Sequence, residues 1–391
     1  MSNETRPEIR FPGFTEDWEQ RKVFEISKVT YGGGTPKTNT KEFWNGNIPW
    51  IQSSDLEINR LFNVSPKKKI TNEAVKKSAA KIIPPNSIAI VTRVGVGKLA
   101  LMPFEYATSQ DFLSLSELQI DSYFGIFSLY SMLQKELKNI QGTSIKGMTK
   151  SDLLEKKVTI PKKCEEQQKI GTFFKQLDDT ITLHQRKLDL LKETKKGFLQ
   201  KMFPKNGAKV PEIRFPGFTE DWEERKLGEL TKIKTGSSDL QDADAKGIYP
   251  FFVRSEIIER SNRYIFDGEA ILIPGEGRLG EIYHYINGKF DFHQRVYKIS
   301  DFQYSDTDGK YILYYMQKYF KKHAMKYTVK ATVDSLRLPM LTEFDIKIPS
   351  LDEQRAISSF FSNLDQAITL HQRKLDLLKE TKKGFLQKMF V

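Results

Sequence analysis

Cysteine is nearly missing from this sequence of 391 residues, in which Cys164 is the only one. A disulfide within the chain is therefore impossible, and so is a metal site built from several cysteine thiolates. Long apolar runs are missing too, and the first ten residues, MSNETRPEIR, lack the apolar core of a signal peptide. We therefore expect a cytoplasmic protein that has no contact with a membrane.

Catalytic motifs are equally scarce. The residues 275–280, GEGRLG, fit the dinucleotide pattern GxGxxG, but the following EIYHYI alternates like a strand where a helix should open, so a hairpin turn is predicted. Gly97-Lys98 does not complete a P-loop, because Thr92 stands where glycine is required. No metal-ligand spacing links the five histidines, His184, His284, His293, His323 and His371. We find no defensible acid–base pair of carboxylates and no motif typical of a methyltransferase or nuclease. The sequence thus favours a binding protein, with no catalytic residue, metal ion or cofactor of its own.

Positive charge is present in excess, with 62 lysines and arginines against 50 acidic residues and a formal net charge of +12. Such an excess favours an anionic partner, of which nucleic acid is the commonest large one. Hydrophobic residues make up 39% of the chain and aromatic residues 12%, which suffices for packed cores, and the length suggests two or three domains. On charge alone, a basic protein without such a partner remains the alternative.

Two stretches of the sequence occur twice. ITLHQRKLDLLKETKKGFLQKMF occupies residues 181–203 and returns unchanged at residues 368–390. PEIRFPGFTEDWE occupies residues 7–19 and returns at residues 211–223. We call the second stretch the head and the first the tail. The chain therefore consists of a head, a variable middle and a tail, followed by the same three parts again with a shorter middle.

The repeated tail has the heptad pattern of a coiled coil, because its apolar residues recur at alternating spacings of four and three. Lys195 and Lys382 interrupt this seam at equivalent places, as do two histidines that we expect to set register and pairing. The pattern predicts helices over 166–203 and 353–391, each too long to bury its apolar stripe alone. We expect the two helices to pair in antiparallel fashion; the alternative is that each packs on its own domain. The predicted coiled-coil and partner-binding positions are Leu177, Ile181, His184, Leu188, Leu191, Phe198, Leu364, Ile368, His371, Leu375, Leu378 and Phe385.

The two middles share a plan but not a sequence. Each has a strand, a glycine turn and a second strand, at residues 86–102 and 269–285, and each has an amphipathic helix further on. The predicted fold class is α/β, with two mixed α/β domains separated by an antiparallel coiled coil of two long helices and a pseudo-twofold internal repeat. The predicted boundaries are 1–165 and 211–352 for the domains, 166–203 and 353–391 for the helices, and 204–210 for a linker.

Three segments of the chain resemble the specificity subunits of type I restriction–modification systems. They are GGGTPKTNTKEFWNGNIPWIQSSDL at 32–56, GTSIKGMTKSDLLEKKVTIP at 142–161 with the EEQ that follows, and IKIPSLDEQ at 346–354. The duplicated head and tail around unlike middles is typical of that family, and the resemblance covers essentially the whole chain. The second middle departs from the first, since it has KTGSSDL and YPFFVRS where the first has Thr-Pro and Ile-Pro-Trp.

The resemblance implies that each middle is a target recognition domain that reads one half of a split double-stranded DNA sequence. It also implies that the long helices set the spacing and hold two methylation subunits, which carry S-adenosylmethionine. Restriction subunits, which use ATP and magnesium, would join them, and the complex would methylate or cleave DNA as a host defence. This chain would supply no catalysis.

Basic and polar residues near the glycine turns and the later loops are the expected DNA contacts. They are Arg93, Lys98, Gln110, Thr143, Ser144 and Lys146 in the first middle, and Arg254, Arg278, Gln294, Arg295, Lys330 and Thr332 in the second. Two identical ends and two different middles predict an asymmetric bipartite target. The alternatives are a scaffold that joins two protein partners without DNA, and a stand-alone modification enzyme, which would need a cofactor pocket.

Overall fold

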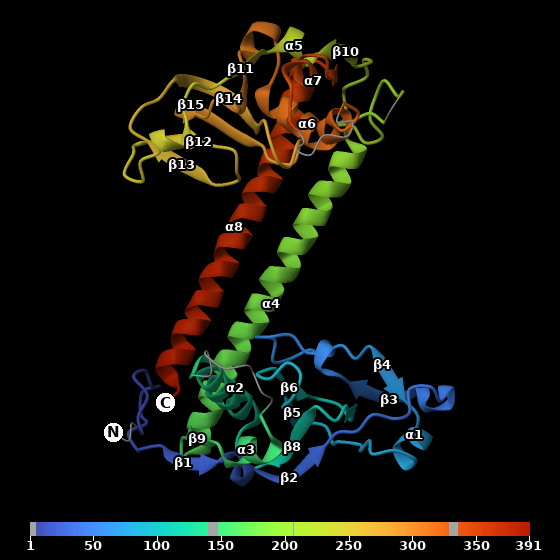
Figure 1. Ribbon diagram of the computed structural model, residues 1–391, viewed down its shortest axis with the longest axis vertical. Coiled ribbons are helices and arrows are strands. Elements are labelled where there is room, and N and C mark those ends of the chain that lie inside the picture. The colour runs from blue at the N-terminus through green and yellow to red at the C-terminus, as the bar shows by residue number, and fades with distance from the viewer. Residues whose placement is uncertain (1–4, 140–147, 206, 328–334) are drawn as a thin grey trace. The chain divides into compact units, whose positions relative to one another are not determined.

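The computed structural model describes residues 5–139, 148–205, 207–327 and 335–391, and the chain falls into two compact units. Unit 1 comprises residues 1–184 and 373–391, and unit 2 comprises residues 185–372. Each unit contains sheets, short helices and parts of the two longest helices (Figure 1). This is the mixed α/β composition that the sequence predicts. Among the described residues, no helix combines the length and the apolar composition that a membrane span requires.

The first middle folds around a four-stranded antiparallel sheet in the order β2-β8-β5-β6. Its strands are β2 (Ser27–Gly32), β5 (Ser87–Val91), β6 (Leu99–Met102) and β8 (Phe112–Leu118). A second sheet has the order β4-β3-β7, formed by β3 (Trp44–Ile51), β4 (Lys68–Ile70) and β7 (Ala107–Thr108). The helices of this middle are η1 (Val23–Ile26), η2 (Lys41–Phe43), η3 (Ser53–Asp55), α1 (Asn72–Lys76), α2 (Ser122–Asn139) and α3 (Lys150–Glu155).

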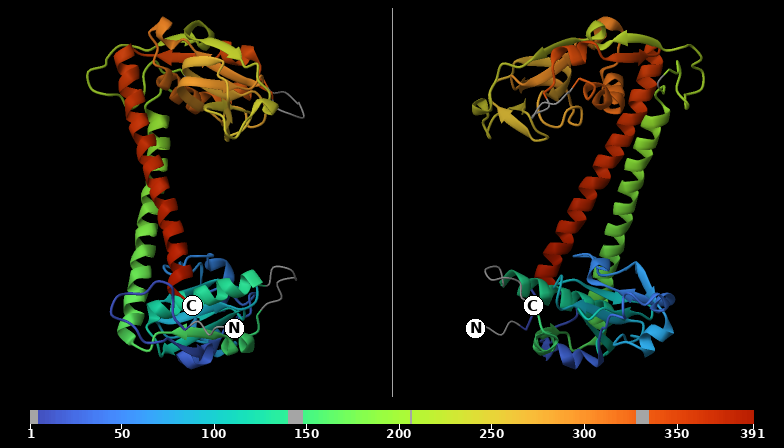
Figure 2. Two further views of the ribbon diagram at one scale, coloured as in Figure 1. Left: turned by 90° about the vertical axis from the view of Figure 1, so that its left-hand side faces the viewer. Right: turned by 45° about the vertical axis from the view of Figure 1, so that its right-hand side comes forward.

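The second middle has a different sheet, with six strands in the order β11-β16-β14-β15-β12-β13. Its strands are β11 (Lys232–Thr235), β12 (Tyr249–Phe252), β13 (Ile258–Ser261), β14 (Phe266–Pro274), β15 (His284–Phe292) and β16 (Val296–Ser300). The helices are α5 (Leu227–Leu230), η4 (Leu240–Asp242), η5 (Phe302–Ser305), α6 (Gly309–Ala324) and α7 (Leu338–Thr342). Figure 2 shows α6 beside this sheet.

Both predicted strand–turn–strand segments are confirmed. In unit 1, β5 and β6 pair in antiparallel fashion around a turn in which Gly95 and Gly97 have φ values of +92° and +94°. Glycine adopts such values without steric cost, which explains its place in this turn. In unit 2, β14 and β15 form the corresponding antiparallel pair. GEGRLG therefore lies in the hairpin connection between β14 and β15, as predicted from the strand-like residues that follow it.

The heads have the same role in both units. Strand β1 (Glu19–Lys22) pairs with β9 (Lys157–Ile160), and β10 (Glu223–Lys226) pairs with β17 (Asp345–Ile348) in the equivalent register. Each head thus leads into a strand that pairs with the strand that leads, through Ile-Pro, into a long helix. The two strands of each short sheet therefore come from opposite ends of one half of the chain, and their pairing brings those ends together.

A buried ionic contact joins each head to the start of its long helix. Arg10 donates two hydrogen bonds to the Glu166 carboxylate, at 2.5 and 2.8 Å, and Arg214 donates two to Glu353, both at 2.7 Å. Both glutamates are only 1% exposed. The neighbouring glutamine, Gln167, accepts a hydrogen bond from the backbone of Asp121 and donates to a proline carbonyl. Gln354 makes the same two contacts in unit 2. The Glu-Gln dipeptide is therefore a structural joint between head, helix and middle.

The long helices α4 (Cys164–Lys201) and α8 (Leu351–Met389) run antiparallel to each other within each unit (Figure 1). Their ends lie two residues from the predicted ones, within the usual uncertainty of helix ends. In unit 1 the start of α4 meets the end of α8, with the rings of Phe173 and Phe385 5.2 Å apart. In unit 2 the end of α4 meets the start of α8, with the rings of Phe198 and Phe360 4.9 Å apart.

The last residues of each helix belong to a hydrophobic core. Met389 and Phe390 lie in the core of unit 1 with α2, and Met202 and Phe203 lie in the core of unit 2 with α6. Each long helix therefore starts in one unit and ends inside the core of the other. The alternative that each helix packs only on its own domain is wrong.

The lysines that interrupt the heptad seam form equivalent ion pairs between the helices. Lys382 lies 2.5 Å from Asp178, and Lys195 lies 2.6 Å from Asp365. The first pair is well covered, with side chains 10% and 14% exposed, whereas Asp365 is 40% exposed. Burial raises the pKa of Asp178 above its ordinary value, while Lys382 opposes the rise. The same lysine–aspartate pair thus occurs in both units, and it is more deeply buried in unit 1 than in unit 2.

This difference in burial predicts unequal costs for the same substitution. Asp178→Asn leaves Lys382 unpaired in a covered site and should lower the free energy of unfolding by about 3 kcal/mol. Asp365→Asn removes a pair that water already screens and should cost less than about 1 kcal/mol. Urea denaturation followed by circular dichroism measures both. Equal losses of unfolding free energy in the two variants would contradict the idea that burial determines how much each pair stabilises the protein.

Candidate nucleic-acid interface

In unit 1, the turn between β5 and β6 and the loop before β8 present the predicted residues together. Arg93 is largely exposed, and its guanidinium lies 3.9 Å from the Asp111 carboxylate. The backbone of Thr92 donates to the Asp111 carbonyl at 2.7 Å, which joins the two loops. Lys98 points inward, since its ammonium donates to the Ser53 carbonyl at 3.0 Å. Arg93 is thus free to reach a ligand, whereas Lys98 also holds the turn in place.

The glycine run 32–34 explains how Gln110 is positioned. A side chain at Gly33 would lie 1.9 Å from the Ser109 carbonyl, so only glycine permits this close approach of the two segments. The backbone of Gly34 then donates to the Thr108 carbonyl at 2.8 Å. The next residue, Thr35, donates a hydrogen bond to the Gln110 side chain. The GGGTP segment of the first middle therefore positions Gln110, which is one of the predicted DNA contacts.

Sequence reasoning missed Lys150 and Lys81. Lys150, at the start of α3, lies against Gly32, where an added Cβ would be 2.7 Å from its ammonium. Burial lowers the pKa of Lys150, and the positive charges of Arg93 and Lys81 lower it further, with Asp111 opposing them. Three cations thus gather near one carboxylate. The only signal in the sequence is that Lys150 lies within one of the family-like segments.

In unit 2, the predicted arginines converge on carboxylates. Arg254 donates to Glu276 at 3.0 Å, and Arg295 donates to the other oxygen of the same carboxylate. Arg278 donates to Glu256. The side chain of Gln294 donates to Asp239 at 3.2 Å. The structure thus brings the predicted residues of three loops together and pairs each with an acidic group.

A buried polar network supports the loop of Gln294 and Arg295. Asp291 is fully buried and accepts hydrogen bonds from Ser238 at 2.5 Å and from Arg263 at 3.2 Å. His293 is also buried, and its Nδ1 accepts from the backbone N–H of Arg295 at 2.9 Å. Satisfied networks of this kind give a loop one conformation. The acidic partners and this network escaped sequence reasoning, because the residues lie far apart along the chain.

Five predicted contacts lie outside the residues that the structure describes. Thr143, Ser144 and Lys146 fall in the range 140–147, and Lys330 and Thr332 fall in the range 328–334, neither of which is described. These residues stay predictions from the sequence.

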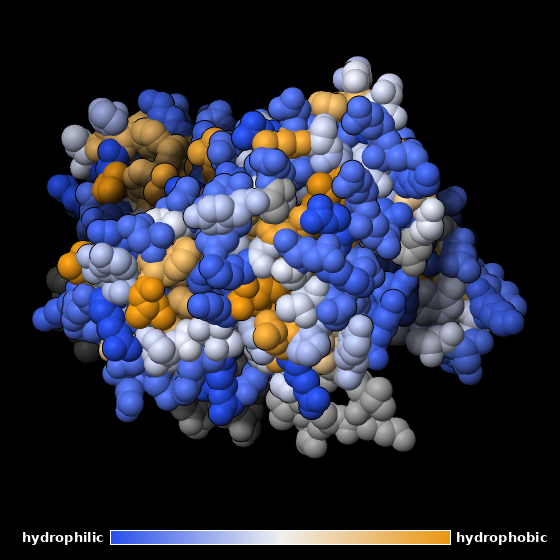
Figure 3. Space-filling view, turned by 90° about the horizontal axis from the view of Figure 1, so that it is seen from above, coloured by the Kyte–Doolittle hydropathy of each residue, from blue (hydrophilic) through white to orange (hydrophobic). Residues whose placement is uncertain are grey.

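The predicted coiled-coil positions are all at least partly covered. Leu188 and Leu375, which are equivalent, are each 1% exposed. The hydrophobic residues that remain on the surface form small groups among hydrophilic ones on the face in Figure 3. Scattered apolar residues of this kind are normal on a protein surface.

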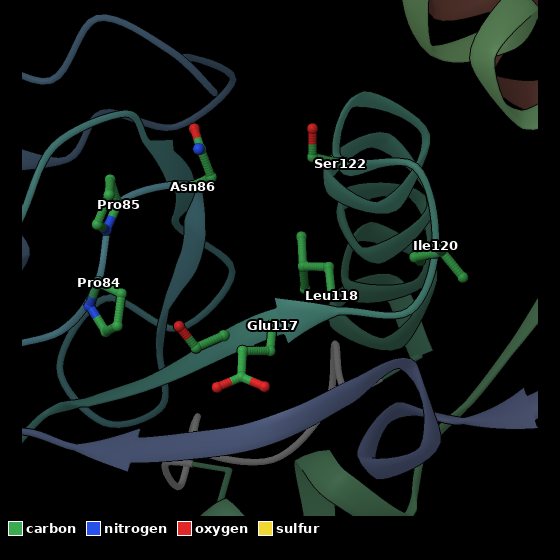
Figure 4. A pocket seen from close by; sticks show the side chains of 8 residues that line it. Pro84, Pro85, Asn86, Glu117, Leu118, Ile120 and Ser122 are labelled. Carbon is green, nitrogen blue, oxygen red and sulfur yellow. The ribbon is translucent and has the colours of Figure 1, made fainter.

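The described ranges contain no group of three or more histidine, cysteine or acidic residues that could hold a metal ion. A surface pocket of about 340 Å³ lies beside the start of α2 and the end of β8 (Figure 4). Its lining includes one carboxylate, that of Glu117, and neither histidine nor cysteine. None of the predicted DNA contacts lines this pocket.

Two α/β units share a common frame but have unlike middles, and loops of both middles carry exposed arginines. The family model for the type I restriction modification DNA specificity domain matches the chain twice, at residues 15–193 and 219–380. The chain therefore belongs to the specificity subunits of type I restriction–modification systems, and its function is the recognition of a DNA sequence.

Relatives extend over nearly the whole chain. The type I restriction enzyme MjaIX specificity subunit of Methanocaldococcus jannaschii is 26% identical over 96% of this chain and 93% of its own length. The EcoR124I/EcoR124II specificity subunit of Escherichia coli is 49% identical, but over 20% of this chain and 19% of its own length. The S subunit of a type I system from M. genitalium has the same fold, with a TM-score of 0.72, 16% identity and 99% coverage of both chains.

Arg93 is the residue of unit 1 at which a contact to a base can be tested most clearly. If it reads a base, Arg93→Ala should weaken binding to the preferred sequence by about 1–3 kcal/mol and relax one base position. Competition binding against a panel of singly substituted duplexes measures this. Arg21→Ala removes the same charge from β1 and is the control. An equal loss on every duplex would make Arg93 a phosphate contact.

Proposed function

We propose that this chain reads an asymmetric bipartite DNA sequence, with one recognition domain for each half, and supplies no catalysis itself. The first domain comprises residues 1–165 and the second residues 211–352. The helices at 166–203 and 353–391 set the distance between the two half-sites, and residues 204–210 link the halves. The DNA contacts are the residues predicted from the sequence.

The observation that carries this proposal is the contrast between repeated contacts and unlike middles. The head–helix joint and the lysine–aspartate pair occur in both units with equivalent residues. The sheets between them have different strand orders and different exposed side chains. Two identical frames suit two copies of one partner. Two different sheets suit two different short DNA sequences, one in each half-site, which we call words.

Exposed leucines on the long helices are the best candidates for docking the methylation subunits. Leu183 and Leu190 on α4 are 67% and 61% exposed, and their equivalents on α8, Leu370 and Leu377, are 66% and 67% exposed. They lie outside the predicted seam, within the unchanged repeat. Exposed leucines in two identical stretches support two identical docking surfaces, one for each of two methylation subunits.

The complex would divide the work among its subunits. The methylation subunits bring S-adenosylmethionine and transfer the methyl group, and the restriction subunits bring ATP and magnesium. Lysines and arginines of this chain supply affinity through phosphate contacts, which weaken steeply as salt rises. Side chains in the major groove supply specificity, because each base pair presents a distinct pattern of donors and acceptors there.

A scaffold that joins two protein partners without DNA would also use the repeated helices. It gives no reason for the cations around Arg93 or for the arginine cluster at Glu276. The family match favours the DNA-reading function as well.

Selection from a random duplex library tests the proposal directly. The chain, co-purified with its methylation partner at near-physiological salt, should enrich two unlike short words at a fixed gap. Exchanging the second middle should then change only one word. Formation of the complex without enrichment of any sequence would support the scaffold instead.

The leucines give a separate test of docking. Replacing Leu183 and Leu370 together by glutamate should weaken the affinity for the methylation subunit by at least tenfold. Size-exclusion chromatography or calorimetry measures this change. The melting temperature should hardly change, because both side chains are exposed. The equivalent change at the buried Leu188 and Leu375 should instead lower the melting temperature. Full binding by the first variant would place the docking surface elsewhere.

A further inference from the structure

Glycines in the GEGRLG turn between β14 and β15 allow its backbone to lie close to neighbouring segments. The backbone of Gly275 donates to the Arg295 carbonyl at 2.7 Å, and a side chain there would lie 2.8 Å from that oxygen. Gly277 and Gly280 have positive φ values, and a side chain at Gly280 would meet the backbone of Lys321. Leu279 is buried and anchors the turn in the core. Gly275 and Gly280 thus allow the turn to lie close to its neighbours, and Gly277, next to Glu276, adopts a left-handed backbone conformation that favours glycine.

Three separate segments meet at Glu276. Arg254 follows β12, and Arg295 lies between β15 and β16. Ser335, which follows the undescribed range 328–334, forms an antiparallel bridge with Glu276, and the backbone of Leu336 donates to the Gly275 carbonyl at 2.7 Å. Glu276 therefore lies where the loops that carry Arg254 and Arg295 come together.

The carboxylate of Glu276 is shared by two guanidinium groups. The Arg254 Nη1 lies 3.0 Å from one carboxylate oxygen, and the Arg295 Nη1 contacts the other. The hydrogen bond from Arg254, helped by that from Arg295, holds the pKa of Glu276 below its ordinary value. Glu276 is 28% exposed, less than Arg254 at 45% and Arg295 at 55%. The two arginines are thus more exposed than the carboxylate that they share.

We infer that Glu276 is a specificity-determining residue of the second recognition domain, where it orients Arg254 and Arg295 toward base edges and restrains them from phosphates. This inference rests on the proposed DNA-reading function. Glu276 acts through the two arginines and is therefore a positioning residue.

Geometry supports the orienting role. A guanidinium has five N–H donors, and each arginine spends a terminal nitrogen on Glu276, so most of its donors stay available. An arginine held by one edge presents the other in a fixed direction, which a bidentate contact to the O6 and N7 atoms of guanine requires. A free arginine would lose more side-chain freedom when it binds.

Charge supports the restraining role. Phosphate contacts bind any DNA sequence, and their strength depends on the positive charge that the protein presents. A carboxylate between two arginines removes part of that charge and repels phosphate. Affinity for arbitrary DNA falls, while contacts to the correct bases persist. The ratio of specific to non-specific binding therefore rises.

Glu276→Gln tests both roles, because it keeps the size of the side chain and removes its charge. Library selection with the complex of this chain and its methylation partner should return the first word unchanged and a degenerate second word. Affinity for a random duplex should rise by about three- to tenfold at physiological salt, and its salt dependence should steepen. The preference for the selected second word over single mismatches should fall by at least about fivefold.

Asp267→Asn is the matched control, because it removes one negative charge from β14 at the end of the strand that is farther from the turn with Glu276. It should leave both words and the random-duplex affinity unchanged. Glu276→Asp keeps the charge and shortens the reach, so it should relax the second word without raising the affinity for random DNA. Thermal melting of every variant confirms that the units stay folded.

The outcomes separate this inference from the function on which it rests. A sharp second word in the Glu276→Gln complex would overturn the inference and leave two-word reading intact. Equal broadening in Asp267→Asn would overturn it too, since any lost charge would then have the same effect. Absence of a split motif in the unaltered complex would overturn the proposed function itself.

Discussion

Each unit depends on the ionic contact between an arginine of the head and a glutamate at the start of a long helix. Glu166 and Glu353 are almost completely buried, and Arg10 and Arg214 bind them through two hydrogen bonds each. A carboxylate in such a place is tolerated only with its partner, because a buried unpaired charge is strongly destabilising. The contact holds the head on the helix, and the head strand in turn holds the strand that enters the helix. The joint therefore fixes the start of each long helix against its head.

The repeated contacts explain why head and tail recur so faithfully. The end of each long helix is buried in a core, and the backbone at Ile9 and Ile213 donates to helix carbonyls at Lys388 and Lys201, at 3.0 and 2.9 Å. Head, helix start and helix end therefore constrain one another in each unit. The middles meet the long helices through an apolar face and a few hydrogen bonds, such as those of Gln167 and Gln354, so the rest of each middle is free to differ in strand order and in surface chemistry.

The two proposed reading surfaces use charge differently. Around Arg93 and Lys150, cations outnumber the one neighbouring carboxylate, and the lowered pKa of Lys150 reflects their mutual repulsion as well as burial. Around Glu276, acidic and basic side chains alternate, and each arginine has a carboxylate partner. If both surfaces read DNA as proposed, the first arrangement favours contacts to phosphate and the second favours selective contacts to bases. Two domains of one chain can thus differ in how much affinity and how much discrimination each contributes.

The sequence by itself determined the repeat, the α/β class, the long helices and the two glycine hairpins, because these features depend on local periodicity and on residues with unusual backbone freedom. The DNA contacts at Arg93, Arg254 and Arg295 stay predictions from the sequence, since basic residues in loops are common DNA contacts. Only the tertiary structure decided that Lys382 and Lys195 meet Asp178 and Asp365, that the helix ends enter the cores, and that Glu276 joins two arginines. Partners that lie far apart along the chain leave no local pattern, so their meeting depends on packing that spacing alone does not encode.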